Sequence, residues 1–279
     1  MKGMKIAVTG GTGKAGRACV AELVEHGHEV TVVDRARPTA GVPFLLADLT
    51  DFGQAVGAFS GMDAIVHLAA IPAPGIHTNA ETFRNNALSD YHVFEAARLL
   101  GIANVVWASS ETVLGLPFDT PPPYVPLDEA YPGRPESAYS LAKLVTETMA
   151  EQFCRWNPEQ KIFGLRFSNV MEPHDYAAFP AFERDAERRR WNLWCYIDAR
   201  DAAQAVRLAV ESPLKGAEVF IIANGDTVMG RSSADLMAKR FPDVPLKRPL
   251  EGREAPMSSE KARRMLGYAP EHDWGGSTG

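Results

Sequence analysis

The stretch Thr9-Gly10-Gly11-Thr12-Gly13-Lys14-Ala15-Gly16 decides how the chain begins to fold, because it joins two elements through a turn rich in glycine. Residues 4–9, which lead into it, are mostly apolar and predict a short strand. Apolar residues then recur at helical spacing until Gly27, and residues 29–33 predict a second strand that Asp34 closes. Glycines permit a tight turn and a close approach of the backbone to a phosphate at a helix N-terminus. Strand, glycine turn, helix, strand and acid in this order predict a dinucleotide-binding unit.

Asp34 and Arg35 bear on which dinucleotide is bound. Asp34 stands at the tip of the second strand, 24 residues after Gly10, and is placed to accept hydrogen bonds from both ribose hydroxyls of an adenosine. The same carboxylate repels a 2′-phosphate, which favours NAD over NADP. Arg35 leaves two interpretations open: its guanidinium accommodates the phosphate, or it is a solvated loop residue.

Strands and helices continue to alternate along the chain. The third to sixth predicted strands cover residues 42–47, 62–70, 104–108 and 161–167. Long helices are predicted over residues 80–100 and 138–155. This alternation is typical of an α/β protein, here a Rossmann doubly wound parallel sheet.

Beyond residue 171 the alternation becomes irregular. Strands are expected over residues 194–198 and 218–223, and helices over residues 201–211, 232–241 and from 261 to Gly267. We therefore expect residues 1–170 to form an NAD-binding Rossmann domain. Residues 171–279 are expected to form a small mixed α/β substrate-binding lobe that is interleaved with the end of the sheet.

Polar or small side chains follow the carboxyl ends of the predicted strands, where ligands bind in open parallel sheets. Asp48-Leu49 follow the third strand, and Asp48 is placed to reach an adenine amino group. Alternatively, Asp48 or Thr50 caps the helix that begins near Asp51. The fourth strand ends in Leu68-Ala69-Ala70, small residues next to which a cofactor passes close to the backbone.

Two further strand ends carry polar residues. Ser109-Ser110 follow the fifth strand, although Ser109 is also suited to satisfying turn amides. Phe167 ends the sixth strand, and Ser168-Asn169 follow it. His67 lies within an apolar run, where we expect a packed, hydrogen-bonded histidine.

Tyr139 and Lys143 lie one helical turn apart and project from the same face of their helix. A tyrosine hydroxyl has an ordinary pKa of ~10 and is a poor base at neutral pH, but a nearby lysine charge favours the phenolate. A serine hydroxyl presented opposite, from Ser109 or Ser110, is suited to holding the substrate oxygen that gains or loses the proton. These are the groups needed to move a proton while a cofactor moves a hydride.

The loop before this helix is long. Residues 114–137 hold seven prolines and two glycines, so little regular structure is expected there. A loop of this length inside a compact domain is usually functional, and we expect it to cover a substrate. Arg184, Arg188, Arg189 and Arg190 stand among acidic residues, which predicts a solvated mixed-charge helix. The alternative is that one of these arginines binds a substrate carboxylate or phosphate.

Composition places limits on the class of protein. With 279 residues, 46% hydrophobic and 23% charged, the chain has ordinary globular composition. A net charge of −6 argues against a nucleic-acid partner, and the apolar runs fall short of the ~20 residues of a membrane span. No signal peptide is expected before the first strand. Three widely separated cysteines suggest reduced thiols in the cytoplasm and predict no metal site.

Taken together, these motifs resemble the extended short-chain dehydrogenase/reductases, the NAD-dependent epimerase/dehydratase family. The glycine stretch matches the T-G-x-x-G-x-x-G of that family. The other matching positions, in the expected order, are Asp48-Leu49, residues 67–70, Asn86, Ser109-Ser110, Tyr139 with Lys143, residues 196–201 and residues 261–270. The likeness therefore covers essentially the whole chain.

The resemblance implies roles for individual residues. Tyr139 is implied to be the acid/base, Lys143 to lower its pKa and bind the nicotinamide ribose, and Ser110 to orient the substrate oxygen. The residues expected to bind NAD are Gly10, Thr12, Gly13, Lys14, Ala15, Gly16, Asp34, Arg35, Asp48, Leu49, Leu68, Ala69, Ala70, Asn86, Tyr139, Lys143, Phe167 and Asn169. Family members often pair two long helices across a two-fold axis, so a homodimer is expected.

Departures from the family pattern indicate the reaction. Glu111 and Thr112 replace the Asp-Glu pair of sugar 4,6-dehydratases, which disfavours dehydration. Residues 169–173 depart from the Asn-Val-x-Gly-Pro of epimerases, and Trp194 stands where an arginine for the nucleotide diphosphate is expected. The chain is also short for a protein that encloses a UDP-sugar.

These departures resemble uronate dehydrogenase-like members, which act on free sugars or sugar acids. We therefore expect NAD-dependent oxidation of a hydroxyl of a sugar or sugar acid. A UDP-sugar 4-epimerase is the alternative. A non-catalytic NAD-sensing module is a third, and it has no need of Ser110, Tyr139 and Lys143 together.

Overall fold

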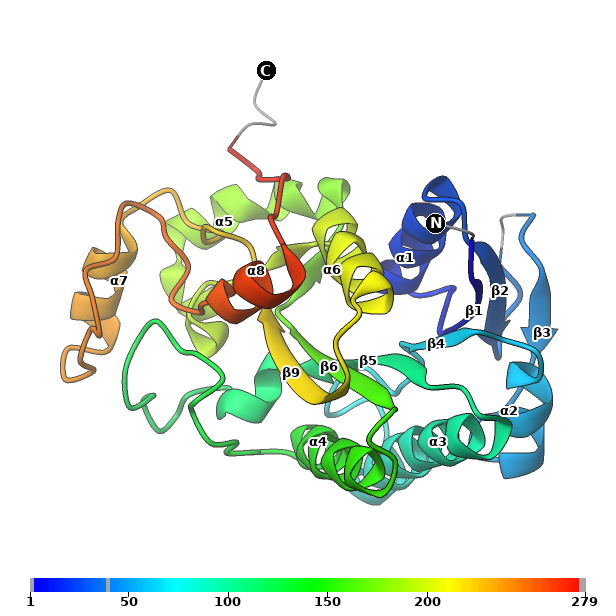
Figure 1. The fold of residues 1–279 in the computed structure, drawn as a ribbon. Coiled ribbons are helices and arrows are strands. Elements are labelled where there is room, and N and C mark those ends of the chain that lie inside the picture. Colours follow the sequence, from blue (N-terminus) through cyan, green and yellow to red (C-terminus); the bar gives the residue numbers. More distant parts are fainter. Residues whose placement is uncertain (1–2, 39–40, 276–279) are drawn as a thin grey trace.

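A seven-stranded parallel sheet forms the centre of the computed structural model, which describes residues 3–38 and 41–275 (Figure 1). Its order is β3-β2-β1-β4-β5-β6-β9, so the chain winds outward from β1, returns, and winds outward on the other side. The strands are β1 (Lys5–Thr9), β2 (Glu29–Asp34), β3 (Phe44–Leu46), β4 (Ala64–His67), β5 (Asn104–Ser110), β6 (Lys161–Phe167) and β9 (Gly216–Ile222). This is the expected doubly wound Rossmann fold, whose ligand crevice lies where the order reverses, between β1 and β4.

Helices cover both faces of the sheet (Figure 1). One face packs against α1 (Lys14–Glu25), α6 (Ala199–Glu211) and α8 (Glu260–Leu266). The other packs against α2 (Phe52–Phe59), α3 (Asn79–Leu100) and α4 (Ala138–Trp156). Alternate residues of β1 enter the two cores: Ile6 and Val8 face the first, and Ala7 faces the second. Both faces are therefore buried, as is usual in a parallel sheet.

A third cluster of apolar residues lies beyond the carboxyl end of β6. It contains two short strands, β7 (Val170–Met171) and β8 (Ile197–Asp198), with α5 (Phe179–Arg184), α7 (Ser233–Arg240) and two 3₁₀ segments, Pro173–Ala178 and Ala186–Asn192. Its core is rich in aromatic and apolar side chains, among them Phe179, Trp194 and Tyr196. After β8 the chain returns to the main sheet through α6 and β9, and it returns again through α8 after α7. The two regions are therefore interleaved in sequence.

Local structure departs from expectation at three places. The strand expected over residues 194–198 is only Ile197–Asp198, because Leu193 and Trp194 adopt φ of 54° and 60°, a left-handed turn that no strand contains. Asp51, rather than Asp48 or Thr50, caps α2 by accepting a hydrogen bond from the Gln54 N–H. Arg189 is buried, so the expectation of a solvated mixed-charge helix is wrong for this residue.

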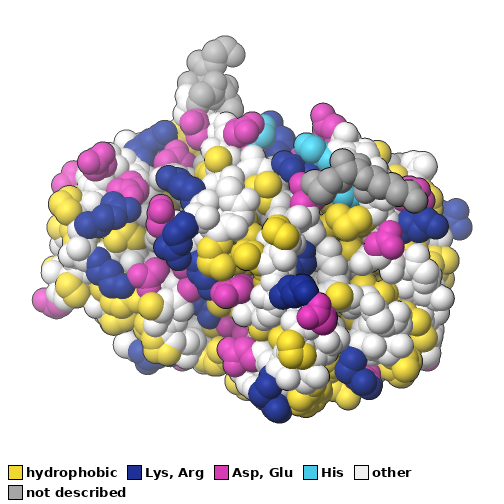
Figure 2. Space-filling view, in the orientation of Figure 1, with side chains coloured by type: hydrophobic (Ala, Val, Ile, Leu, Met, Phe, Trp, Pro, Cys, Tyr) yellow, Lys and Arg dark blue, Asp and Glu magenta, His cyan; other side chains and the backbone are white. Residues whose placement is uncertain are grey.

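The outer surface has a mixed charge distribution. On the face drawn in Figure 2, lysine and arginine side chains are interspersed with aspartate and glutamate. Within residues 3–38 and 41–275, no helix combines the length and the apolar composition needed to cross a membrane.

Candidate functional site

Two adjoining cavities lie at the carboxyl ends of the central strands. The smaller, of about 290 Å³, lies beside the ends of β1, β2 and β4, and the larger, of about 910 Å³, extends past the end of β5 to α4. Both are lined by Gly10, Gly13, Leu68, Ala70 and Pro72. The shared wall makes them one continuous site at the switch point of the sheet.

The glycine turn forms this shared wall and requires its glycines. Gly10 has φ of +68°, and a Cβ there would lie 2.6 Å from the Ala69 nitrogen. A Cβ on Gly16 would lie 2.1 Å from the Gly10 carbonyl oxygen. The turn ends at Gly13, the N-cap of α1, and no described side chain caps that helix. The first N–H groups of α1 are thus available to an anionic group, as binding of a pyrophosphate requires.

Asp34 and Arg35 line the smaller cavity at the tip of β2. The Asp34 carboxylate accepts hydrogen bonds from the Thr12 N–H (3.0 Å) and hydroxyl (2.7 Å), which fix it beside the glycine turn. The Arg35 guanidinium donates to Asp48 at 2.5 Å, and this bond lowers the pKa of Asp48 to about 2. Arg35 is therefore paired with a carboxylate that lines the same cavity, an arrangement that favours NAD over NADP.

Ser110, Tyr139 and Lys143 line the larger cavity together. Ser110 ends β5, and the other two lie on α4, whose first turn is fixed by a capping box between Ser137 and Ser140. The Ser110 oxygen accepts hydrogen bonds from the N–H (3.2 Å) and hydroxyl (3.0 Å) of Thr112. Because these bonds occupy its acceptor sites, the Ser110 hydroxyl is left to donate its own proton into the cavity.

The structure brings together all but one of the residues that the sequence predicted for the site. The predicted residues that line the two cavities are Gly10, Thr12, Gly13, Lys14, Ala15, Gly16, Asp34, Arg35, Asp48, Leu49, Leu68, Ala69, Ala70, Ser110, Tyr139, Lys143, Phe167 and Asn169. The exception is Asn86, whose amide accepts from the Ile71 N–H (2.9 Å) and donates to the Ile71 carbonyl (3.0 Å). Asn86 thus fixes the loop after β4 instead of lining the site.

Two predicted polar residues have partners inside the protein. The Ser109 hydroxyl donates to Glu147 on α4 at 2.6 Å, which differs from the alternative that it accepts from turn amides. The Lys14 ammonium lies 2.5 Å from Asp175, and Arg17 on the same helix lies 2.7 Å from Glu172. The two ion pairs join the start of α1 to the 3₁₀ segment that follows β7. They also pair both acidic members of a cluster of Glu172, His174 and Asp175, in which only the histidine is fully exposed.

A buried polar network in the wall of the larger cavity was not predicted. Glu111 accepts hydrogen bonds from the Ser168 hydroxyl (2.6 Å) and the Asn192 amide (3.1 Å). Arg189, 4% exposed, donates to the Asn169 side-chain oxygen at 2.7 Å. Burial raises the pKa of Glu111 to about 7, although its hydrogen bonds oppose the shift.

The sequence offered only a partial signal for this network. Ser168 directly follows a predicted strand and Glu111 follows the Ser109-Ser110 pair at the end of another, so their positions at the ligand edge were accessible to sequence reasoning. Arg189 and Asn192 lie within a charged run whose burial has no local signature. Asn85, Ser89 and Trp191 also line the cavities, and nothing in the sequence singled them out.

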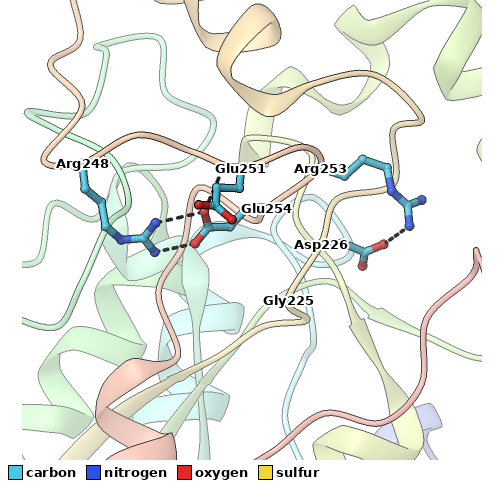
Figure 3. A pocket seen from close by; sticks show the side chains of 6 residues that line it. All are labelled: Gly225, Asp226, Arg248, Glu251, Arg253 and Glu254. Carbon is cyan, nitrogen blue, oxygen red and sulfur yellow. Dashed lines mark hydrogen bonds and ion pairs between the residues drawn. The ribbon is translucent and has the colours of Figure 1, made fainter.

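A separate hollow of about 590 Å³ lies in the aromatic-rich region, lined by Gly225, Asp226, Arg248, Glu251, Arg253 and Glu254 (Figure 3). Arg248 donates to both carboxylate oxygens of Glu254, and Arg253 lies 3.1 Å from Asp226. Four of the five charged side chains drawn there thus form two ion pairs, the Glu251 backbone N–H donates to Glu254, and none of the predicted site residues line this hollow.

The doubly wound sheet, the glycine turn at its switch point, and a serine, a tyrosine and a lysine around one cavity define a class of protein, the short-chain dehydrogenase/reductases. A sequence model described as the NAD dependent epimerase/dehydratase family matches residues 6–223. The chain belongs to this family and is an NAD-dependent enzyme.

Relatives within the class have different activities. The chain is 27% identical over 307 residues to the UDP-glucose 4-epimerase of Corynebacterium glutamicum (96% of this chain, 92% of that protein). It is 29% identical over 233 residues to the L-arabinose 1-dehydrogenase (NAD(P)(+)) of Haloferax volcanii (80% and 89%). The crystal structure of a short-chain dehydrogenase/reductase superfamily protein from Agrobacterium tumefaciens with bound NAD has the same fold. Its TM-score is 0.76 at 22% identity, over 97% of this chain and 94% of that one.

Proposed function

We propose that the protein oxidises a hydroxyl group of a free sugar or sugar acid, with Tyr139 as acid/base. The main support for the proposal is that Ser110, Tyr139 and Lys143 all line one cavity, and that this cavity extends to the glycine turn. A protein that only senses NAD needs the turn but not these three side chains.

Each residue has a role that follows from its position. NAD, when bound, supplies the acceptor for the hydride that leaves the substrate carbon. Tyr139 takes the proton of the substrate hydroxyl, and Ser110 donates a hydrogen bond to the same oxygen while the carbonyl forms. Lys143 binds the nicotinamide ribose and holds a positive charge near the phenolate. Asn169 presents its amide N–H groups to the substrate, because Arg189 occupies its side-chain oxygen.

A free sugar is favoured over a nucleotide sugar by the charges of the cavity. Among the described residues that line it, Lys14 and Lys143 are the basic ones, and Lys14 is paired with Asp175. Trp194, where an arginine for a diphosphate was expected, is buried and donates its indole N–H to the Ala186 carbonyl. Both lysines of the described lining thus have a carboxylate partner, since Lys143 lies 3.7 Å from Asp90, and the cavity offers a nucleotide diphosphate no unpaired basic side chain among those residues.

The substrate lobe is proposed to consist of the irregular region after residue 171 together with the proline-rich loop. Leu116, Pro117, Glu136 and Ser137 of that loop line the cavity, as does Trp191. We also propose a cytoplasmic homodimer, supported by three buried free thiols and by apolar residues on the outer faces of α3 and α4.

An NAD-dependent UDP-sugar 4-epimerase is the second candidate, favoured by the near full-length match to the Corynebacterium glutamicum epimerase. An epimerase oxidises its substrate transiently and reduces it again, so purified protein would retain NAD tightly and release no net NADH. The dehydrogenase releases NADH with a free sugar. A screen of free aldoses, uronates and UDP-sugars, with NAD and NADP in parallel and absorbance of the reduced cofactor as the signal, distinguishes the two.

The first prediction concerns Tyr139. With the best substrate of that screen, Tyr139→Phe should lower kcat by roughly 10²–10⁴-fold, because the proton acceptor is lost. Binding of NAD, followed by quenching of tryptophan fluorescence, should persist. Tyr91→Phe, which removes a hydroxyl on the outer face of α3, is the matched control and should retain full activity. Undiminished turnover by Tyr139→Phe would refute the acid/base assignment.

A further inference from the structure

A chain of buried polar groups connects the glycine turn with Lys143. Thr9, the last residue of β1, contacts His67 at the end of β4 through its hydroxyl and the ring Nδ1 (2.7 Å). The His67 Nε2 lies 2.8 Å from Asp90 on α3. The second carboxylate oxygen of Asp90 accepts from the Thr146 hydroxyl (2.7 Å) and lies 3.7 Å from the Lys143 ammonium.

The hydrogen-bond directions in this chain follow from Thr9. Its hydroxyl oxygen accepts from the Leu68 N–H (3.2 Å) and the Ala69 N–H (3.1 Å), so its own proton is left for the His67 Nδ1. An Nδ1 that accepts leaves the proton of a neutral imidazole on Nε2, which donates it to Asp90. The ammonium group that faces the Asp90 carboxylate is that of Lys143.

The pair formed by Asp90 and Lys143 is buried, so each charge depends on the other. Asp90 is 0% exposed and Lys143 is 2% exposed, so neither charge is compensated by bulk water. Burial alone raises the pKa of Asp90, but the charge of Lys143 and the hydrogen bonds from His67 and Thr146 outweigh it, and the pKa lies below its ordinary value. The Lys143 ammonium in turn lies 5.3 Å from the centre of the Trp107 ring. Removing one partner of a buried pair leaves the other charge uncompensated.

We propose, on the basis of the function assigned above, that Asp90 is the counter-ion and positioning residue of Lys143. Its carboxylate keeps the ammonium charged and at the cavity wall, and the chain through His67 and Thr9 joins that position to the turn that carries the dinucleotide. The titratable groups that face Asp90 are His67 from β4 and Lys143 from α4. Asp90 touches neither cavity, so it acts through the lysine.

Acetylation of Lys143 tests the proposal without a known substrate. Acetic anhydride reacts only with a neutral amine, and peptide mapping gives the pH at which half of Lys143 is modified. In Asp90→Asn this pH should fall by on the order of one to three units, because the buried charge loses its counter-ion. Thr146→Val keeps the carboxylate but removes one of its hydrogen bonds, and should leave that pH within about half a unit of the wild type.

The outcomes separate this role from the assignment of Lys143 itself. Protection of Lys143 by NAD⁺ in the wild type tests the assignment, and its absence contradicts the proposed function. An unchanged half-modification pH in folded Asp90→Asn overturns the counter-ion role even where NAD⁺ protects.

A double-mutant comparison decides the case in which Asp90→Asn does not fold. If the role of the Asp90 carboxylate is to compensate the Lys143 charge, the double variant Asp90→Asn/Lys143→Met should recover folded protein, because neither charge is then left uncompensated. Failure of the double variant to fold where Lys143→Met folds would contradict the proposal.

Discussion

Glu111 is a buried acid whose pKa lies close to neutral pH. Burial raises its pKa from 4.5 to about 7 despite bonds from Ser168 and Asn192. The folded protein therefore keeps a proton at Glu111 between pH 4.5 and about 7 that the unfolded chain has already lost. Since the folded state binds more protons in this window, stability falls as the pH rises through it.

Glu111→Gln should remove this dependence. The free energy of unfolding of the wild type should fall relative to that of the variant between pH 5 and pH 8, by up to about 3 kcal/mol. Urea unfolding at both pH values measures the difference. Glu136→Gln, at an exposed position of the same cavity, is the control, and its pH dependence should match the wild type. Identical pH dependence in all three proteins would contradict the role assigned to burial.

At the scale of the element, the contact between the glycine turn and α1 is the most constrained. A Cβ on Gly16 would lie 2.1 Å from the Gly10 carbonyl, which is backbone and has no rotamer with which to move away. Gly57 on α2 has nothing within 4 Å of its would-be Cβ. The two helical glycines thus differ in their surroundings and not in their chemistry.

Gly16→Ala should therefore destabilise the protein by about 1–3 kcal/mol and weaken NAD binding, because α1 must move away from the turn. Gly57→Ala should be neutral or stabilise it by about 0.5–1 kcal/mol, since alanine favours a helix interior. Melting temperatures and NAD titrations of the two variants provide the test. Equal melting temperatures would show that the turn is more compliant than its geometry indicates.

At the scale of the whole molecule, α3 and α4 lie side by side on one face of the sheet (Figure 1) and carry large exposed apolar side chains. Trp156 is 57% exposed at the end of α4 and contacts Phe153, which also contacts Tyr91 of α3. Leu99 and Leu141 are exposed on the same two helices. Burial of such residues against a second copy is the driving force that we propose for a homodimer.

Light scattering should therefore find a dimer, and Trp156→Glu should shift it toward the monomer, because a buried unpaired charge opposes association. Leu214→Glu, at an exposed leucine outside these helices, should remain dimeric. A wild-type monomer at micromolar concentration would remove the expectation.

Local patterns accounted for the elements and for much of the site. The turn at Gly10, the acid at Asp34 and the pair Tyr139 and Lys143 depend on spacing within one or two adjacent elements, so periodicity reveals them. Residues at strand ends, such as Ser110 and Asn169, were also predictable, because parallel strands end at one edge of the sheet.

The interior partners were not predictable in this way. Asn86, which was expected to bind NAD, bonds to the Ile71 backbone instead. Ser109, for which turn amides were an alternative, donates to Glu147. Arg189, which was expected in solvent or on a substrate, donates to Asn169. Nothing in the sequence distinguished Asp90 from the other polar residues of the predicted helix. A polar side chain can be buried wherever the fold supplies a hydrogen-bond or charge partner. Because that partner comes from another part of the chain, the local sequence does not reveal the burial.

The amino-acid sequence by itself determined the doubly wound fold, the dinucleotide turn and the tyrosine-lysine pair, because short-range spacing specifies which faces of each element are apolar. Only the tertiary structure decided that Glu111 is buried in the cavity wall, that Arg189 holds Asn169 from behind that wall, and that Asp90 faces Lys143. Residues 53 positions apart, such as Asp90 and Lys143, meet only when whole helices pack on the sheet, and that packing depends on the entire core rather than on either residue.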